Sequence, residues 1–247
     1  MTLARSTRRR ADLLLVERGL FDSRAKAQAA IAAGLVTADN VVVAKPSSEI
    51  ALDAALCAAP AHPYVSRGGV KLAAALDKLG LVVAGRVCLD VGASTGGFTE
   101  VLLARGARRV YAVDVGHDQL HASLRARAEV TVFEQTDIRT LDAARLPEVP
   151  GLVVVDVSFI SLKKVLPAAL ALATPRLNLV ALIKPQFEVG PRDVKKGIVR
   201  DPVLHAAVRD DIAAFVASLG LLVDQVMPSP ITGGDGNREF LIGAHRD

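Results

Sequence analysis

Residues 87–103 read VCLDVGASTGGFTEVLL, and this stretch decides the fold class. Its apolar start predicts a buried strand, its small residues a tight loop, and its end an amphipathic helix. A dinucleotide fingerprint that begins at Gly92 would need a glycine where Ser94 stands, and no G-K-S or G-K-T follows. We therefore expect an α/β sheet whose glycine loop binds neither a nicotinamide nucleotide nor a P-loop phosphate.

The chain after residue 64 alternates between helical and strand-like patterns. Helices are expected at 70–79 and 98–104, after the fourth strand and before the sixth. Strands are expected at 87–91, 109–114, 130–133, 152–157, 177–183, 221–226 and 239–244. This alternation predicts a doubly wound, seven-stranded, mostly parallel sheet. The 247 residues are 51% hydrophobic and 23% charged, which excludes a disordered or collagen-like chain.

Three carboxylates stand where successive strands are expected to end, namely Asp90, Asp114 and Asp137. S-adenosylmethionine offers an α-amino group, a ribose diol and an adenine amine as donors. We expect Asp114 to accept from the ribose, Asp137 from the adenine, and the loop to hold the methionine portion. The predicted fold is thus a Rossmann-like methyltransferase sheet with S-adenosylmethionine as cofactor. The expected cofactor-binding residues are Asp90, Gly92, Ala93, Ser94, Thr95, Gly96, Gly97, Phe98, Asp114 and Asp137.

The front of the chain is basic, since residues 1–71 hold 10 Lys and Arg against 6 Asp and Glu, and the remainder holds 20 of each. Helices are expected at 10–20 and 23–34 and a hairpin at 35–43, in a small α+β domain over 1–57, with a linker at 58–63 before a domain over 64–247. The order resembles the alpha-L RNA-binding motif, which implies cations placed against RNA phosphates. A solvated basic tail is the alternative. The residues expected to bind RNA are Arg8, Arg9, Arg10, Arg18, Arg24, Lys26 and Arg67.

Ionisable residues are also expected at the carboxyl edge of the sheet. Asp156 follows the fourth strand and Lys184 the fifth, while Glu239 begins the last strand, which runs antiparallel in sheets of this kind. Because neighbouring strands lie about 4.8 Å apart, these side chains can face one pocket, which Lys71 can reach from the helix ahead of the first strand. The result is an ordered Lys-Asp-Lys-Glu set at one edge of the sheet.

The sequence Asp156-Val-Ser-Phe lacks the N-P-P-Y pattern of amine methylation. Cys57 and Cys88 stand too far from the expected ligand edge for a nucleophile and are too few for a metal site, so no metal is expected.

Five segments carry a family resemblance: YVSRGGVKL, LDVGASTGGFTEVLL, VVVDVSFISL, LIKPQFEVG and GGDGNREFLI. With the alpha-L module, they resemble the TlyA-type family, whose members are named both hemolysins and ribosomal RNA 2'-O-methyltransferases. The second domain is similar to FtsJ-type RNA ribose methyltransferases, whose Lys-Asp-Lys-Glu tetrad falls on Lys71, Asp156, Lys184 and Glu239. The resemblance implies methylation of a cytidine ribose in ribosomal RNA, with that RNA or a ribosomal subunit as partner. For this reaction we expect Lys184 to accept the hydroxyl proton, with Lys71 as a nearby positive charge, while Asp156 orients the two lysines and Glu239 holds Lys71 or the hydroxyl. His117 and His121 are the alternative bases.

Two other functions remain as alternatives. A membrane-active hemolysin would need a spanning segment or a strongly amphipathic cationic helix, and the most apolar window, 165–183, is interrupted by Pro167, Pro175 and Arg176. A non-catalytic RNA-binding protein of ribosome assembly would not need an intact tetrad. Two cysteines and no secretory signal lead us to expect a cytoplasmic protein.

Overall fold

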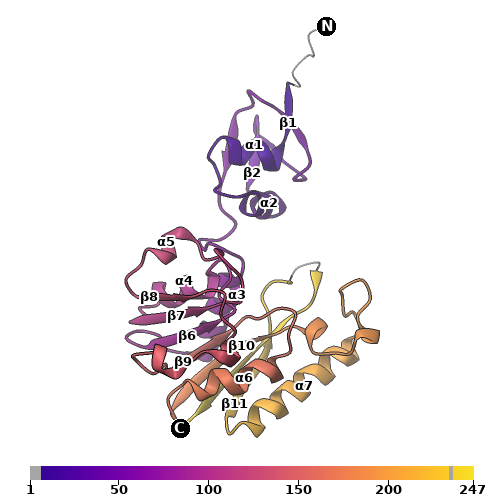
Figure 1. Cartoon of the computed structure of the whole chain (residues 1–247). Coiled ribbons are helices and arrows are strands. Elements are labelled where there is room, and N and C mark those ends of the chain that lie inside the picture. Colours follow the sequence, from indigo (N-terminus) through magenta and orange to yellow (C-terminus); the bar gives the residue numbers. More distant parts are fainter. Residues whose placement is uncertain (1–6, 234–235) are drawn as a thin grey trace. The chain divides into compact units, whose positions relative to one another are not determined.

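The computed structural model describes residues 7–233 and 236–247. The first six residues of the expected RNA-binding domain and two residues of the GGDGNREFLI segment therefore lie outside the described part. The chain divides into two compact units, residues 1–63 and 64–247 (Figure 1).

The N-terminal unit packs two short helices against short strands. Ser23 caps the second helix by accepting from the Lys26 backbone N–H, and Leu15, Ile31 and Val36 lie in the core. The first helix begins later than expected, because Arg10 is extended and pairs with Glu49. The elements are β1 (Arg8–Arg10), α1 (Ala11–Glu17), α2 (Arg24–Ala32), β2 (Val36–Ala38), β3 (Val41–Val42), β4 (Glu49–Ala51) and β5 (Leu56–Ala58).

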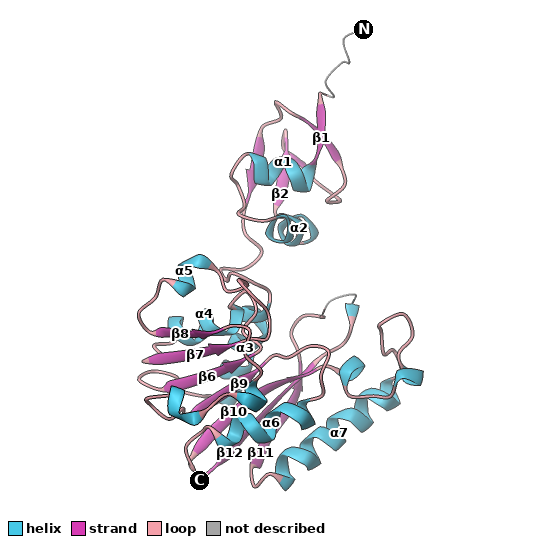
Figure 2. Cartoon of the chain, viewed as in Figure 1, coloured by secondary structure: helices cyan, strands magenta, loops and turns pink. Residues whose placement is uncertain are grey.

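The larger unit is built on a seven-stranded sheet with the order β11-β12-β10-β9-β6-β7-β8 (Figure 2). β12 runs antiparallel to both of its neighbours, while the other pairs in the sheet are parallel. The doubly wound, mostly parallel sheet with an antiparallel last strand is therefore confirmed. Its strands are β6 (Val87–Val91), β7 (Arg109–Val113), β8 (Val130–Phe133), β9 (Leu152–Val155), β10 (Leu177–Ile183), β11 (Leu222–Pro228) and β12 (Phe240–Arg246).

Helices cover both faces of this sheet. One face packs Cys88, Val110 and Val154 with α3 and α4, and the other packs Leu89, Val153 and Leu179 with α6 and α7. Alternate residues of a strand thus enter opposite cores, as expected for strands buried on both faces. The helices are α3 (Gly68–Leu79), α4 (Gly97–Ala104), α5 (Ala122–Arg125), α6 (Leu162–Ala171) and α7 (Pro202–Ser218). Among the described residues, no helix is long and apolar enough to cross a membrane.

Candidate active site

The glycine loop after β6 is shaped by close packing inside the protein. Gly92 has φ +84°, and a Cβ there would lie 2.4 Å from the carbonyl oxygen of Asp156. A Cβ at Gly97 would lie 2.2 Å from the hydroxyl oxygen of Ser66. Only glycine fits both positions without a shift of the backbone or a neighbour. The loop is therefore held against the ends of β9 and α3, which fixes the floor of the site.

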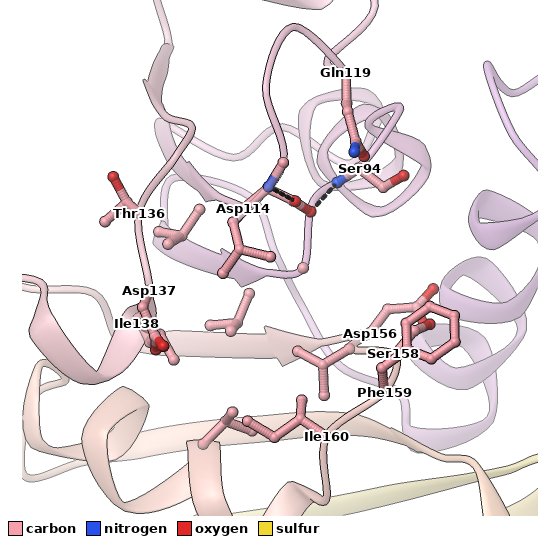
Figure 3. Close-up of a pocket in the computed structure, with 17 residues that line it drawn as sticks. Ser94, Asp114, Gln119, Thr136, Asp137, Ile138, Asp156, Ser158, Phe159 and Ile160 are labelled. Carbon is pink, nitrogen blue, oxygen red and sulfur yellow. Dashed lines mark hydrogen bonds between the residues drawn. The ribbon is translucent and has the colours of Figure 1, made fainter. Parts of the chain in front are cut away.

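Two adjoining cavities lie at the carboxyl edge of the sheet, and Gly92, Ser94, Asp156 and Ser158 line both of them. The first, which we call the Asp114 cavity, has a volume of about 390 Å³ and is also lined by Thr136, Asp137, Ile138 and Gln119 (Figure 3). The second, the Lys184 cavity, has a volume of about 270 Å³ and is also lined by Ser66, Arg67, Lys71, Ala93, Thr95, Gly97 and Phe98.

The three strand-end carboxylates have different surroundings. Asp114 accepts from the backbone N–H of Ser94 at 2.8 Å and of Gly116 at 2.7 Å, so it joins two turns while facing its cavity (Figure 3). Asp137 caps a short 3₁₀ turn and pairs with Arg139 at 2.5 Å, and this pairing lowers its pKa. Both carboxylates line the cavity where the sequence places the cofactor nucleoside.

Asp90 was expected to contact the cofactor, but the structure places it away from both cavities. It is fully buried, accepts from the Thr99 hydroxyl at 2.6 Å and lines neither cavity. Burial raises the pKa of its carboxyl to about 7. Asp90 therefore ties β6 to α4 beneath the loop. Gly96 also lines neither cavity, because its surroundings are the side chains of Leu120 and Leu124.

The four expected catalytic residues form two ion pairs. Lys71 Nζ lies 2.5 Å from Glu239 Oε2, with side chains that are 9% and 3% exposed. Lys184 Nζ lies 2.6 Å from Asp156 Oδ1 and donates to the Ser158 hydroxyl at 2.8 Å. Three of the four line the Lys184 cavity, and Glu239 reaches it through Lys71. The topology that the sequence predicts thus brings the tetrad together.

Sequence reasoning missed Ser158 and Phe159, which stand two and three residues after Asp156. Phe159 is 90% exposed, adopts a left-handed backbone with φ +64° and lines the Asp114 cavity. Its ring centroid lies 5.1 Å from that of Phe187. An exposed aromatic in a conformation that non-glycine residues rarely adopt is a marker of a functional position. A sequence shows neither the exposure nor the dihedral angle.

The alternative nucleophiles and bases are placed elsewhere. His121 Nδ1 accepts from the Ser123 backbone N–H at the start of α5, and neither His117 nor His121 lines a cavity. Cys88 is buried inside β6, where burial raises the pKa of its thiol to about 12. Cys57 belongs to β5 of the N-terminal unit. Within the described residues, no cluster of His, Cys, Asp or Glu suits a metal ion.

The described cations of the N-terminal unit that the sequence assigns to RNA binding have partners within that unit. Arg18 donates to the carbonyl oxygens of Leu52 and Ala54. Arg10 and Arg24 both pair with Asp12, which is fully buried and whose pKa they hold well below its usual range. The remaining contacts are Arg8 with the Glu49 carbonyl, Arg9 with Glu17 and Lys26 with Asp22.

Comparison with known proteins supports the same division of the chain. The FtsJ-like methyltransferase family matches residues 64–246, and the S4 domain matches residues 9–54. The chain is 44% identical over 238 residues to the 16S/23S rRNA (cytidine-2'-O)-methyltransferase TlyA of Mycobacterium tuberculosis, covering 95% of this chain and 89% of that protein.

Two further relatives extend the comparison. The 23S rRNA (cytidine-2'-O)-methyltransferase TlyA of Campylobacter jejuni is 41% identical over 180 residues, covering 72% of this chain and 69% of that protein. A solved structure from Streptococcus thermophilus that carries a hemolysin name superimposes with a TM-score of 0.77 at 39% identity, covering 98% of this chain and 90% of that one. The resemblance inferred from the sequence is confirmed. The chain belongs to the FtsJ-like methyltransferase family, with an S4 domain ahead of its methyltransferase domain.

Proposed function

We propose that the protein transfers a methyl group from S-adenosylmethionine to the ribose 2'-hydroxyl of a cytidine in ribosomal RNA. The observation that carries this proposal is that two enclosed ion pairs, Lys71–Glu239 and Lys184–Asp156, lie beside the Asp114 cavity, whose walls suit the cofactor. The family and the names of its relatives support the substrate class. A ribosomal RNA substrate would place the protein in the cytoplasm.

The Asp114 cavity fits S-adenosylmethionine in the chemistry of its walls. Asp114 supplies carboxylate oxygens with lone pairs beyond the two that accept from backbone N–H groups, and these suit a ribose diol. Both oxygens of Asp137 accept from Arg139, so an adenine amine would replace part of that exposed ion pair. Val113, Val115 and Ile138 supply apolar surface for a purine ring. The cofactor, when bound, supplies a methyl group already activated on a sulfonium. The loop from Gly92 to Phe98 would direct that group toward the Lys184 cavity.

Lys184 is the proposed proton acceptor. As the hydroxyl oxygen gains the methyl group, its proton passes to Lys184 Nζ. Only the free amine can accept this proton, so the ammonium must first release one to solvent. Asp156 and Ser158 hold Nζ from two sides, at 2.6 Å and 2.8 Å, and thereby fix its position in the cavity. Positioning of this kind is what an already activated methyl donor chiefly requires.

Lys71 and Glu239 would form the second wall of the acceptor site. Lys71 lines the Lys184 cavity, and Glu239, which does not line it, forms an ion pair with the Lys71 ammonium. A buried cation at this point favours the developing negative charge on the hydroxyl oxygen. The proposed roles of the tetrad thus divide into proton acceptance by one lysine and charge stabilisation by the other.

Phe159 would provide a stacking surface for the target nucleotide. RNA-modifying sites commonly hold an unstacked base against an aromatic ring. Phe159 is exposed at the rim of the Asp114 cavity beside Asp156 and Ser158 (Figure 3). The ring of Phe187 lies against the Phe159 ring. A base stacked there would leave its ribose beside the Lys184 cavity.

The proposed RNA-docking domain comprises residues 1–57, followed by a linker at 58–63 and the methyltransferase domain at 64–247. Its contacts divide the expected cations into two kinds. Arg9 and Lys26 are held only by other surface side chains and can exchange these for phosphates. Arg18 instead joins α1 to the segment after β4 through two carbonyl oxygens. We therefore expect Arg9→Ala/Lys26→Ala to weaken RNA binding at unchanged stability, and Arg18→Ala to lower stability.

The proposed function is tested by methyl transfer to purified small and large bacterial ribosomal subunits that lack the modification. Labelled S-adenosylmethionine should give a 2'-O-methylcytidine, identified by nucleoside mass spectrometry. A chain without residues 1–62 should bind the cofactor but fail to methylate, since docking is separate from chemistry. Label found on a base, or full methylation by the shortened chain, would contradict the proposal.

A further inference from the structure

A basic hairpin lies between β10 and α7. Residues 192–200, which we call the basic hairpin, read RDVKKGIVR and contain Arg192, Lys195, Lys196 and Arg200, all exposed. Figure 1 shows it in the loop that precedes α7. Counting charges over the whole domain hides this segment, because the 20 cations after residue 71 are matched by 20 carboxylates.

The hairpin has a defined conformation. Lys195 and Ile198 exchange two backbone hydrogen bonds, at 3.0 Å and 3.1 Å. Lys196 and Gly197 both have positive φ, +52° and +78°, which is the pattern of a type I′ turn. This turn places the side chains of two consecutive lysines at the tip of a tight reversal.

Two buried polar residues hold the hairpin, one from the segment that leads to Glu239 and one from α7. Asn237 is 3% exposed, accepts from the Val199 backbone N–H at 3.2 Å and donates to the Gly197 carbonyl at 2.9 Å. His205 is also buried, and its Nε2 lies 2.9 Å from the Val199 carbonyl oxygen. Because Asn237 stands two residues before Glu239, the hairpin is tied directly to the tetrad.

The four cations are not committed to the protein itself. None of them forms an ion pair with a carboxylate in the part of the chain that the structure describes. Two acids lie nearby. Asp193 forms no ion pair with these cations, and Asp201 caps α7, where it accepts from the Val203 backbone N–H at 2.8 Å. The hairpin therefore presents positive charge to solvent.

The position of the hairpin matches the substrate side of the sheet. β10 ends at Ile183 just before Lys184, and antiparallel β12 begins at Phe240 just after Glu239, so both place their residues at the carboxyl edge. The hairpin follows the first and is bonded to the approach to the second. We propose that the basic hairpin binds the phosphate backbone of the RNA substrate next to the target nucleotide, and this proposal rests on the proposed function.

When lysines bind RNA phosphates, the binding affinity depends on salt concentration in a predictable way. Each phosphate contact contributes about 0.7 to 0.9 to the slope of log affinity against log salt concentration. We expect Lys195→Ala/Lys196→Ala to lower that slope by about 1.4 to 1.8 for binding to large and small ribosomal subunits, and to weaken binding roughly tenfold. KM for subunits should rise, while kcat at saturating subunits and affinity for S-adenosylmethionine stay unchanged.

The matched control is Lys78→Ala/Arg176→Ala, which removes two exposed cations from the opposite edge, at the end of α3 and the start of β10. It should leave the salt slope unchanged, and Lys195→Arg/Lys196→Arg should keep it near the original. An unchanged slope in the alanine pair, or an equal drop in the control pair, overturns the proposal. Absence of methyl transfer by the unaltered protein would instead refute the proposed function, since the binding slope is measured without turnover.

Discussion

The Lys71–Glu239 pair gives a prediction whose size follows from its burial. Both side chains are more than nine-tenths enclosed, and their charged atoms lie 2.5 Å apart. Glu239→Gln keeps the volume beside Gly233, where the carboxylate is closely packed, but leaves the Lys71 ammonium without its counter-charge. Breaking a buried pair from one side costs about 3–5 kcal/mol, whereas removing both charges is often nearly neutral. Glu239→Gln and Lys71→Met should each destabilise the protein by that amount, and the double variant by much less.

The assay is urea denaturation followed by circular dichroism, because the chain has no Trp. Hydrogen exchange read by mass spectrometry assigns each loss to a unit, and the N-terminal unit, residues 1–63, should be unaffected. The exposed pair Arg127–Glu129 supplies the control, since Glu129→Gln should change stability little. The double variant should be stable and inactive in methyl transfer. Single variants as stable as the unaltered protein, or a double variant as unstable as the worse single, would refute a buried pair.

Three further predictions concern the cavities and the loop beneath them. Lys184→Arg keeps a cation beside Asp156 but cannot accept a proton, so single-turnover methyl transfer should fall about a hundredfold or more. Asp114→Asn should weaken S-adenosylmethionine binding about tenfold in calorimetric titration, because a charge-assisted acceptor is lost. Burial raises the pKa of Asp90 to about 7, so the folded protein holds a proton that the unfolded chain has released. Its free energy of unfolding should therefore fall as pH rises from about 4 to about 7, and Asp90→Asn should remove that slope in urea titrations at each pH.

The seven strands and the placement of the tetrad could be predicted because both follow from patterns along the chain. Buried parallel strands are continuous apolar runs, and their carboxyl ends meet at one edge, so Asp156 and Lys184 had to be neighbours. The antiparallel last strand then brought Glu239 to the same edge. The cofactor contact expected of Asp90 was not predictable in this way, because it depends on packing and not on the pattern along the chain. Its place at a strand end resembles that of Asp114, and only packing decides that it faces Thr99 under the loop.

The β2–β3 hairpin falls within the expected residues 35–43, but the other short strands of the N-terminal unit lay beyond this reasoning. β1, β4 and β5 have three residues each, too few to show an alternation of period two. The same limit applies to Arg18, whose charge and helical position suggest a phosphate contact. Its two carbonyl acceptors lie 34 and 36 residues further along the chain. A role that depends on such distant contacts cannot be read from local sequence.

Charge shows most clearly what the fold adds to composition. The sequence after residue 71 is balanced, yet the carboxylates of the methyltransferase domain are distributed unevenly among its cations. Many bind a partner close by on the surface, as in Asp77 with Arg105, Glu129 with Arg127, Glu134 with Arg125, Asp137 with Arg139, Glu148 with Arg108, and Asp211 with Lys163. Each such pair is nearly neutral at a distance. The positive charge that remains exposed therefore comes from cations without an ion-pair partner among the described residues, and the basic hairpin holds four of them beside the segment that leads to Glu239.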